Sequence, residues 1–485
     1  MKFHSTRSDN TVTSKEALLM GISPDKGLFV PENFPKLGSP SNMTHMQYED
    51  LCYYVLGKYL TDFTPEELKE SVHTAYQKFS TPNVVQINRT SKAYFLELYH
   101  GETAAFKDLA LSLLPELLKC ALASSEDPRK ICLLTATSGD TGKATLESFK
   151  DQKNFKVIVL YPKDGVSGIQ KLQMMTQEGD NVHVLPINGN FDECQSAVKT
   201  LFRDDSLETG NYRLSSANSI NIGRLLPQIV YYIYTYVTLL KYGEITKDET
   251  INFVVPTGNF GNILASYYAK QMGLPIGKVI CASNENDVLT RFFNTGKYDG
   301  TGELLKTNSP SMDILISSNL ERYLYHELGS SEDILTIYEE FEDHRSFELD
   351  LDRFNKDQWI KAYSASDGEG DQKIVNSFID DKYLIDPHTA IALACYNKYL
   401  LDSKDFTKTV ICSTASPYKF ADTILHAFNI DVPTDMEKIR TLHKISEVPI
   451  PKNITKLFYL ESRFHNSFEQ QEIKNTIEEI FHEEN

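Results

Sequence analysis

The sequence lacks the marks of secreted, membrane-spanning and zinc-binding proteins. Its 485 residues include only seven cysteines, an odd number without a C-x-x-C pair, which is typical of free thiols in a reducing compartment. No stretch approaches the ~18 consecutive apolar residues that a membrane helix needs. Residues 1–14 are polar and lack the apolar centre of a signal peptide. We therefore expect a cytoplasmic protein with no metal site and no membrane segment.

Basic residues are scarce relative to acidic ones. Lys and Arg number 49 against 67 Asp and Glu, and the resulting net charge of −18 disfavours binding to nucleic acid or anionic membranes. Hydrophobic residues make up 41% and charged residues 24%, as in ordinary globular proteins. At roughly 100 to 200 residues per domain, this length predicts two to four domains. The composition indicates an enzyme or a multidomain binding protein.

Short apolar runs alternate with longer helical patterns after a turn-rich, helical first section of about ninety residues. These runs are rich in β-branched residues, which is typical of parallel strands buried on both faces of an α/β sheet. We expect strands at 94–98, 131–135, 157–161, 182–186, 251–255, 279–283 and 409–413. Residues 299–381 are more polar, and the acidic tail 469–485 reads as a solvated helix. Neither segment offers an obvious site.

The sharpest local feature follows the strand expected at 251–255 and reads P-T-G-N-F-G-N over 256–262. Two glycines allow a tight turn that presents backbone N–H groups, and the helix expected from Ile263 adds partial positive charge. The loop can therefore hold a phosphate, although it matches neither the P-loop nor G-x-G-x-x-G. An ordinary strand-to-helix turn explains the same residues equally well.

A second loop, T-S-G-D-T-G over 137–142, also joins a strand to a helix. Its hydroxyls and amides can bind a carboxylate, or they can simply cap the helix, which is the commoner role. Lys107 lies between a strand and a helix in A-F-K-D. A lysine in an apolar setting can have a lowered pKa and form a Schiff base with an aldehyde cofactor, although most lysines are solvated. Together the three features match the needs of pyridoxal phosphate and an amino acid.

Eight motifs in the chain resemble those of the threonine synthase family, in its long, yeast-like and enterobacterial-like branch. They are G-L-F-V-P at 27–31, A-F-K-D around Lys107, T-A-T-S-G-D-T-G at 135–142, S-G-I-Q at 167–170, G-N-F-D-E-C-Q at 189–195, S-A-N-S-I-N-I-G-R at 216–224, P-T-G-N-F-G-N at 256–262 and S-T-A-S-P-Y-K-F at 413–420. They occur in the order of the family and span most of the chain.

The resemblance implies a fold-type II pyridoxal-phosphate enzyme, similar to the tryptophan synthase β subunit. It implies two parallel-sheet α/β domains and an N-terminal, mainly helical cap. The expected boundaries are 1–92 for the cap, 93–130 with 224–460 for the larger, cofactor-binding domain, 131–223 for the smaller domain and 461–485 for an acidic tail helix. We expect a monomer or a homodimer.

The resemblance also implies roles for individual residues. Lys107 would hold pyridoxal 5'-phosphate and carry out most proton transfers, and Thr414 would meet the pyridine nitrogen of the cofactor. The other cofactor-binding residues would be Asp140, Gly258, Asn259, Phe260, Gly261 and Asn262. The substrate-binding residues would be Ser138, Gly139, Thr141, Ser167, Asn218, Ser219, Asn221, Arg224 and Lys419. Arg224 suits the substrate phosphate because a guanidinium can donate two parallel hydrogen bonds.

The reaction implied by the resemblance is the conversion of O-phospho-L-homoserine and water to threonine and phosphate by a carbon–oxygen lyase. Ser416 stands where many relatives have histidine. Threonine-synthase-like proteins described as phospho-lyases also have a serine at this position. One alternative is therefore a phospho-lyase that releases 2-oxobutanoate and ammonia. Another is a catalytically silent, ligand-binding relative, which the intact Lys107, the complete 258–262 loop and Arg224 argue against.

Overall fold

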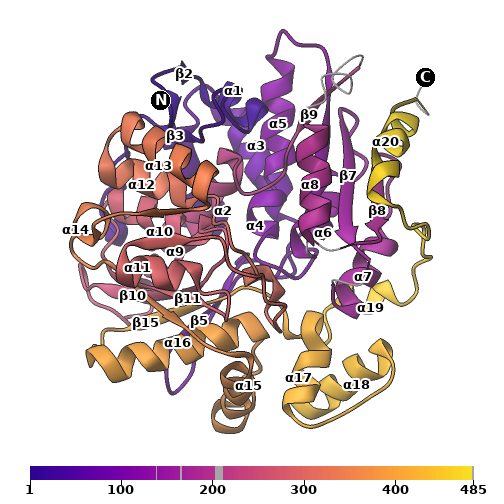
Figure 1. Ribbon diagram of the computed structural model, residues 1–485. Helices are drawn as coiled ribbons and strands as arrows, with labels where there is room; N and C mark the ends of the chain where they lie inside the picture. Colours follow the sequence, from indigo (N-terminus) through magenta and orange to yellow (C-terminus); the bar gives the residue numbers. More distant parts are fainter. Residues whose placement is uncertain (138, 164–165, 190, 203–210, 483–485) are drawn as a thin grey trace.

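Two sheets, one mostly and one entirely parallel, form the centre of the molecule with helices on their faces (Figure 1). The computed structural model describes residues 1–137, 139–163, 166–189, 191–202 and 211–482. The order of the elements alternates strand and helix through most of the chain after the first ninety residues. The predicted α/β class is confirmed.

The larger sheet has six strands in the order β14-β11-β10-β15-β5-β4. All neighbours in this sheet are parallel except β4 and β5. The strands are β14 Ile360–Ser364, β11 Ile276–Ser283, β10 Ile251–Pro256, β15 Thr409–Ser413, β5 Tyr94–Glu97 and β4 Gln86–Arg89.

Helices cover both faces of the larger sheet, and successive residues of β10 point to opposite faces. Phe253 and Val255 pack with helices α9 (Ile222–Lys241) and α10 (Gly261–Gln271). Val254 packs on the other face, with α16 (Pro387–Ser403). A strand buried on both faces is almost entirely apolar, which explains the run I-N-F-V-V-P, in which Asn252 donates a hydrogen bond of 2.9 Å to Asp405 Oδ2.

The smaller sheet has four parallel strands in the order β8-β7-β6-β9. The strands are β8 Val182–Ile187, β7 Phe155–Pro162, β6 Lys130–Ala136 and β9 Tyr212–Ser215. The helices of this layer are α6 Asp140–Phe149, α7 Gly168–Met175 and α8 Phe191–Leu201.

All seven apolar runs expected to be strands form strands of these two sheets. The strands β4, β9 and β14 were not expected, and each lies at the edge of its sheet. Edge strands are less completely buried, so they can carry polar residues, as in Q-I-N-R of β4 and Y-R-L-S of β9. Such short mixed segments lack the apolar signal of a central strand.

The N-terminal section combines the expected helices with a small antiparallel sheet that was not expected. Helix α2 covers Tyr48–Tyr59 and α3 covers Pro65–Tyr76. The sheet has the order β2-β1-β3, with β2 Thr11–Val12, β1 Phe3–Ser5 and β3 Phe29–Pro31.

The other α-helices and strands of the described residues are α1 Ser14–Met20, α4 Asp108–Leu111, α5 Leu114–Ala123, α11 Val288–Thr295, β12 Lys297–Asp299, α12 Leu320–Leu328, α13 Ser331–His344, β13 Ser346–Glu348, α14 Leu351–Phe354, α15 Asp367–Asp381, α17 Ala421–Ala427, α18 Asp435–Ser446, α19 Lys452–Leu457 and α20 Ile473–His482.

The C-terminal helix α20 is not solvated on all sides, so this expectation was wrong. Its residues Ile473, Ile477 and Ile480 are buried in the apolar cluster of β6 and β7. The amine of Lys156 on β7 donates a hydrogen bond of 2.8 Å to the carbonyl of Ile480. Isoleucines spaced four and three residues apart form one apolar stripe that the acidic composition had hidden.

Across the described part of the chain, no helix combines the length and the apolar character needed to cross a membrane.

Candidate active site

The candidate site lies where loops leave the carboxyl ends of strands in both sheets, as is usual for ligand sites in α/β proteins. Two of these loops are joined through their backbones. The amide of Phe106 donates to the carbonyl of Thr414 at 2.8 Å, and the amide of Ser416 donates to Ala104 at 3.0 Å. These bonds hold Lys107, at the start of α4, beside the loop after β15, which contains Thr414.

The Lys107 amine lies among polar groups in a buried setting. Its Nζ donates to Ser311 Oγ at 3.2 Å and lies 3.8 Å from Asp140 Oδ2. Burial lowers the pKa of Lys107 to about 8, against the opposing effect of Asp140, and the positive charges of Lys419 and Arg224 lower it further. A pKa near 8 leaves part of the amine neutral and nucleophilic at physiological pH.

Asp140 is the centre of a buried network. Its Oδ1 accepts hydrogen bonds from Gln170 Nε2 at 2.9 Å and lies 2.6 Å from the amine of Lys419, while its Oδ2 accepts from Ser311 Oγ at 3.2 Å. Burial opposes ionisation, but Lys419 and Lys107 hold the pKa of Asp140 well below its ordinary value. Asp140 is therefore a fixed negative charge.

Lys419 was expected to contact substrate, and in this structure its amine is bound to other groups of the protein. Nζ binds Asp140 and donates to the carbonyl of Thr103 at 3.0 Å, and its side chain has no exposed surface. The nearby Ser167 caps α7 by accepting from the amide of Gln170, and its hydroxyl donates to the carbonyl of Lys419 at 3.3 Å. In this arrangement the side chains of Lys419 and Ser167 hold other residues of the site in place.

The loop from Gly258 to Asn262 offers consecutive free amides. Within the described residues, no protein acceptor is bonded to the backbone N–H of Gly258, Asn259, Phe260, Gly261 or Asn262. Phe260 has a left-handed backbone with φ of 64°, and α10 begins directly after it. Successive free N–H groups at a helix N-terminus form an anion cradle, so the loop fits the phosphate of pyridoxal phosphate.

The side chain of Asn262 shapes this cradle from within. It donates to the carbonyl of Pro256 at 2.8 Å and accepts from the hydroxyl of Thr257 at 2.6 Å. These bonds fix the Asn262 side chain within the loop, and its backbone amide stays available to a ligand.

The segment 218–224 lies beside this loop. Asn319 donates from Nδ2 to the carbonyls of both Ser219 and Asn259, at 3.2 Å each. Ser318 Oγ lies 3.4 Å from Ser219 Oγ and from Asn259 Oδ1. The structure thus brings the residues expected at the cofactor phosphate and at the substrate phosphate into one neighbourhood.

Arg224 is a buried cation without a carboxylate partner among the described residues. One of its terminal nitrogens donates to the carbonyl of Ala217, and its Nε has no hydrogen-bond partner. Burial lowers the pKa of Arg224 to about 10. A buried, partly unsatisfied guanidinium fits an anionic ligand such as a phosphate.

The other expected substrate residues have different places. Asn221 caps α9 and donates to the carbonyl of Leu18 at 3.0 Å, so its side chain faces the N-terminal section. Gly139 has φ of 140°, and a Cβ there would lie 2.5 Å from Gln170 Nε2. Thr141 follows in α6, and the side chain of Asn218 lies partly exposed before α9. Ser138 lies outside the described residues.

Ser311, Ser317 and His388 were missed by the sequence analysis. Ser311 contacts Lys107 and Asp140, and Ser317 Oγ donates to the carbonyl of Gly258 at 2.8 Å. The amide of Ser311 donates to His388 Nε2 at 3.1 Å. Ser311 and Ser317 come from the polar section 299–381 in which no site was expected. Their partners lie far away in sequence, so no local spacing could reveal them.

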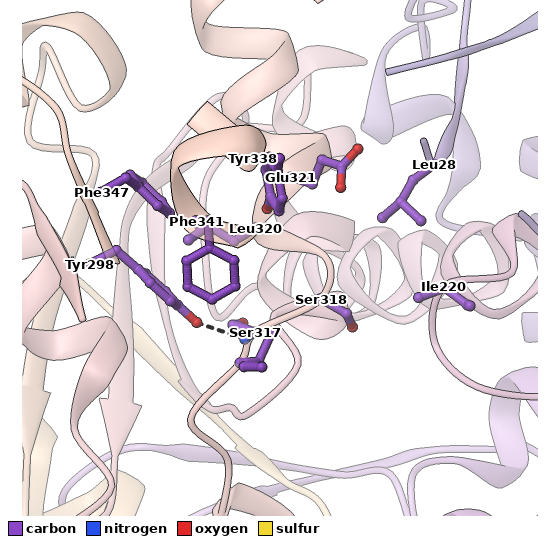
Figure 2. Close-up of a pocket in the computed structure, with 11 residues that line it drawn as sticks. Leu28, Ile220, Tyr298, Ser317, Ser318, Leu320, Glu321, Tyr338, Phe341 and Phe347 are labelled. Atoms are coloured by element: carbon purple, nitrogen blue, oxygen red, sulfur yellow. Dashed lines mark hydrogen bonds between the residues drawn. The ribbon is translucent and has the colours of Figure 1, made fainter. Parts of the chain in front are cut away.

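The segment 316–318 also lines an apolar cavity of about 160 Å³ (Figure 2). Tyr298 lines this cavity, and its hydroxyl accepts a hydrogen bond of 2.7 Å from the amide of Ser317. Phe341 and Phe347 line the same cavity. Aromatic packing therefore supports the segment that holds the cradle.

Comparison with known families matches nearly the whole chain. Residues 2–76 match the family model "Threonine synthase N terminus", residues 80–415 match "Pyridoxal-phosphate dependent enzyme" and residues 389–477 match "Threonine synthase, C-terminal".

Individual relatives agree with these matches. Threonine synthase of Eremothecium gossypii is 34% identical, over 91% of this chain and 94% of its own. Human threonine synthase-like 1 is 38% identical over 86% of this chain, which corresponds to 58% of that longer protein. The crystal structure of threonine synthase from Brucella melitensis with bound PLP superposes with a TM-score of 0.88, at 32% identity and covering 99% of each chain.

Proposed function

The chain belongs to the threonine synthase family, and from this premise we propose how its residues carry out the reaction. The activity is that of a threonine synthase, a lyase that converts O-phospho-L-homoserine and water to L-threonine and phosphate. The cofactor is pyridoxal 5'-phosphate. When bound, this cofactor stabilises the electron pair that remains after a proton leaves an amino acid.

Three groups would hold the cofactor. The amine of Lys107 would bind its aldehyde carbon, because the lowered pKa leaves a neutral, nucleophilic amine. The amides of residues 258–262 would bind its phosphate. Thr414 would meet the ring nitrogen with a neutral hydroxyl, and its backbone already fixes the Lys107 loop.

Lys107 would move the protons of the reaction. Its neutral amine would be able to take the proton from the substrate Cα and later exchange protons at the neighbouring carbons. Asp140 and Ser311 lie within reach of Nζ and would stabilise the resulting ammonium.

Arg224 would bind the phosphate of the substrate. Its positive charge lowers the pKa of Lys107, which supports a place for the substrate phosphate in the same site as the lysine. An anionic ligand would also satisfy its unpaired Nε. This buried cation, which has no carboxylate partner in the part of the chain that the structure describes, is the observation that carries the proposal, because the cofactor phosphate already has its own cradle.

The test is to incubate the cofactor-loaded protein with O-phospho-L-homoserine and to quantify phosphate, threonine and 2-oxobutanoate together. We expect threonine and phosphate in equal amounts, and neither from a Lys107→Ala variant of unchanged fold. Phosphate with 2-oxobutanoate and little threonine would instead establish the phospho-lyase alternative. No phosphate at all would reject the proposed substrate.

We also propose a cytoplasmic location, because all seven cysteines are free thiols. The division into a cap, two sheet domains and a tail helix, and the monomer or homodimer, stay predictions.

A further inference from the structure

Ser311 bridges the two charged groups at the centre of the site. Its Oγ accepts a hydrogen bond from Lys107 Nζ at 3.2 Å and donates one to Asp140 Oδ2 at 3.2 Å. Because the proton of the hydroxyl is used toward Asp140, its lone pairs face the lysine. Ser311 thus presents an acceptor to the amine without adding a charge.

Two residues at the start of α16 fix the position of Ser311. The backbone amide of Ser311 donates to His388 Nε2 at 3.1 Å, and His388 Nδ1 lies 2.6 Å from Asp386 Oδ2. Since Nε2 accepts, the ring proton belongs on Nδ1, where it donates to Asp386. Asp386 is in turn the N-cap of α16, so the chain of bonds ends in a rigid element.

The two residues behind Ser311, His388 and Asp386, are both buried, and each makes hydrogen bonds within the protein. His388 exposes 2% of its surface and Asp386 none. Asp386 accepts from the amides of His388 and Thr389 at 3.0 and 3.3 Å. A histidine held in one tautomer by a buried carboxylate is a fixed acceptor, which suits a positioning role.

We propose that Ser311 is a catalytic residue that receives the amine of Lys107 whenever this lysine is not bonded to the cofactor, and that His388 and Asp386 are positioning residues that act through it. This inference rests on the proposed function and adds a residue to it. The lysine that takes the Cα proton becomes an ammonium, and its N–H groups then donate to Ser311 Oγ and Asp140 Oδ2. The Lys107 ammonium then gives up this proton to a neighbouring carbon of the substrate and becomes a neutral amine again.

Burial and the surrounding charged groups determine the pKa of the Lys107 amine before any variant is made. Asp140 and Asp108 raise the pKa of Lys107, while burial, Lys419 and Arg224 lower it. Removing the Ser311 hydroxyl keeps all four charged residues in the chain, and only Asp140 loses a hydrogen-bond donor by it. A hydrogen bond to the ammonium favours the charged form, so its loss lowers the pKa.

The experiment is competitive acylation of the full-length, cofactor-free chain with acetic anhydride across a pH series. Mass spectrometry follows the Lys107 peptide, with the exposed Lys247 as reference in the same digest. The variants are Ser311→Ala and Ser311→Thr, which remove and retain the hydroxyl, and His388→Phe and His388→Gln, which remove and retain an acceptor. Ser309→Ala is the matched control, because this buried serine of the same loop hydrogen-bonds to Asn284.

We expect the apparent pKa of Lys107 to fall by about half a unit or more in Ser311→Ala, with a shift in the same direction in His388→Phe. Ser311→Thr, His388→Gln and Ser309→Ala should titrate like the natural protein. In the cofactor-loaded enzyme, kcat should fall about tenfold or more in Ser311→Ala with KM unchanged. The resting absorbance should stay the same, because the contact belongs to the free lysine.

An unchanged Lys107 titration in both Ser311→Ala and His388→Phe would overturn the inference, as would an equal shift in Ser309→Ala. If Ser311→Ala does not fold by circular dichroism, Ser311→Cys replaces it, because a thiol keeps the volume and is a weak acceptor. Acylation needs no substrate. A protein that fails to convert O-phospho-L-homoserine would therefore reject the proposed activity while the titration still decides the role of Ser311.

Discussion

The amine of Lys419 and the carboxylate of Asp140 form an ion pair inside the protein, with Nζ 2.6 Å from Oδ1. Neither side chain exposes more than 2% of its surface. The other carboxylate oxygen of Asp140 lies 3.8 Å from the amine of Lys107. The pair therefore sets the charge beside the reactive lysine, and the first prediction concerns its removal.

Replacing Lys419 by methionine should destabilise the protein. The substitution keeps most of the volume but leaves Asp140 buried without its closest cation, which costs about 3 kcal/mol or more in comparable pairs. Urea unfolding followed by fluorescence should show a lower midpoint for Lys419→Met. The double variant Lys419→Met with Asp140→Asn should recover part of the loss, because the uncompensated charge is gone.

A surface lysine provides the control for this experiment. Lys408 Nζ lies 3.0 Å from Glu249 Oε1, with both side chains about one-third exposed (39% and 32%). Lys408→Met should change the free energy of unfolding by less than about 1 kcal/mol. If Lys419→Met and Lys408→Met lowered the free energy of unfolding equally, the buried pair would contribute no more to stability than a surface pair.

Replacing Arg224 by methionine should weaken the use of the substrate without lowering the stability of the protein. The guanidinium is buried, and no carboxylate of the described residues pairs with it, so Arg224→Met should leave the unfolding midpoint unchanged or raise it. The value of kcat/KM for O-phospho-L-homoserine should fall about 10- to 100-fold, since charged hydrogen bonds to the phosphate are lost. Inorganic phosphate should raise the melting temperature of the natural protein more than that of the variant.

The exposed Arg440 is the matched control, and Arg440→Met should alter neither quantity. If Arg224→Met loses stability and retains its kcat/KM, Arg224 is a structural residue and the substrate phosphate binds elsewhere.

Attachment of pyridoxal phosphate should depend on pH through Lys107. Burial, helped by Lys419 and Arg224, lowers the pKa of this amine to about 8. Below that pH the amine is protonated and has no free electron pair, so attachment should be slow and should accelerate as pH rises to a plateau above about 8. Stopped-flow absorbance with the cofactor-free protein measures this rate. An ordinary lysine would still accelerate up to about pH 10.4.

Asp140→Asn is the informative companion variant for this measurement. Asp140 raises the pKa of Lys107, so its neutralisation should move the midpoint of the rate below that of the natural protein. A midpoint that moves upward would show that Asp140 does not act on Lys107 by its charge.

The sequence could predict the parts of the fold and site that are local. A continuous apolar run marks a strand buried on both faces, so β10 and β15 were found, and the turn after β10 identified Gly258 to Asn262. Edge strands such as β9 carry no such pattern. The buried face of α20 was also missed, because an acidic composition outweighed three correctly spaced isoleucines.

Contacts made across the fold could not be predicted in the same way. Ser311 meets Asp140 across 171 positions of sequence, and its contact with His388 uses the backbone amide. Any residue but proline carries that amide, so no residue type marks it. The family resemblance implied that Lys419 contacts the substrate. Only the three-dimensional packing shows that its amine is bound to Asp140 and Thr103.

The last prediction concerns the close approach of two loops at Gly258. A Cβ at this position would lie 3.0 Å from the carbonyl oxygen of Ser311 and 3.4 Å from Cα of Met312. Both are backbone atoms that cannot rotate away, so Gly258→Ala should displace the cradle from the segment that carries Ser311. We expect the dissociation constant of pyridoxal phosphate to rise about tenfold, which corresponds to about 1.4 kcal/mol.

Gly302→Ala is the control, because a Cβ at Gly302 would meet no atom within 4 Å. Cofactor affinity can be measured for both variants by absorbance titration of the cofactor-free protein. Gly302→Ala should bind like the natural protein, whereas Gly258→Ala should bind more weakly and should also shift the Lys107 titration, because Ser311 moves with the cradle. Weaker binding without a shift would mean that the 258–262 loop holds the cofactor independently of Ser311, and unchanged binding would mean that the cradle lies elsewhere.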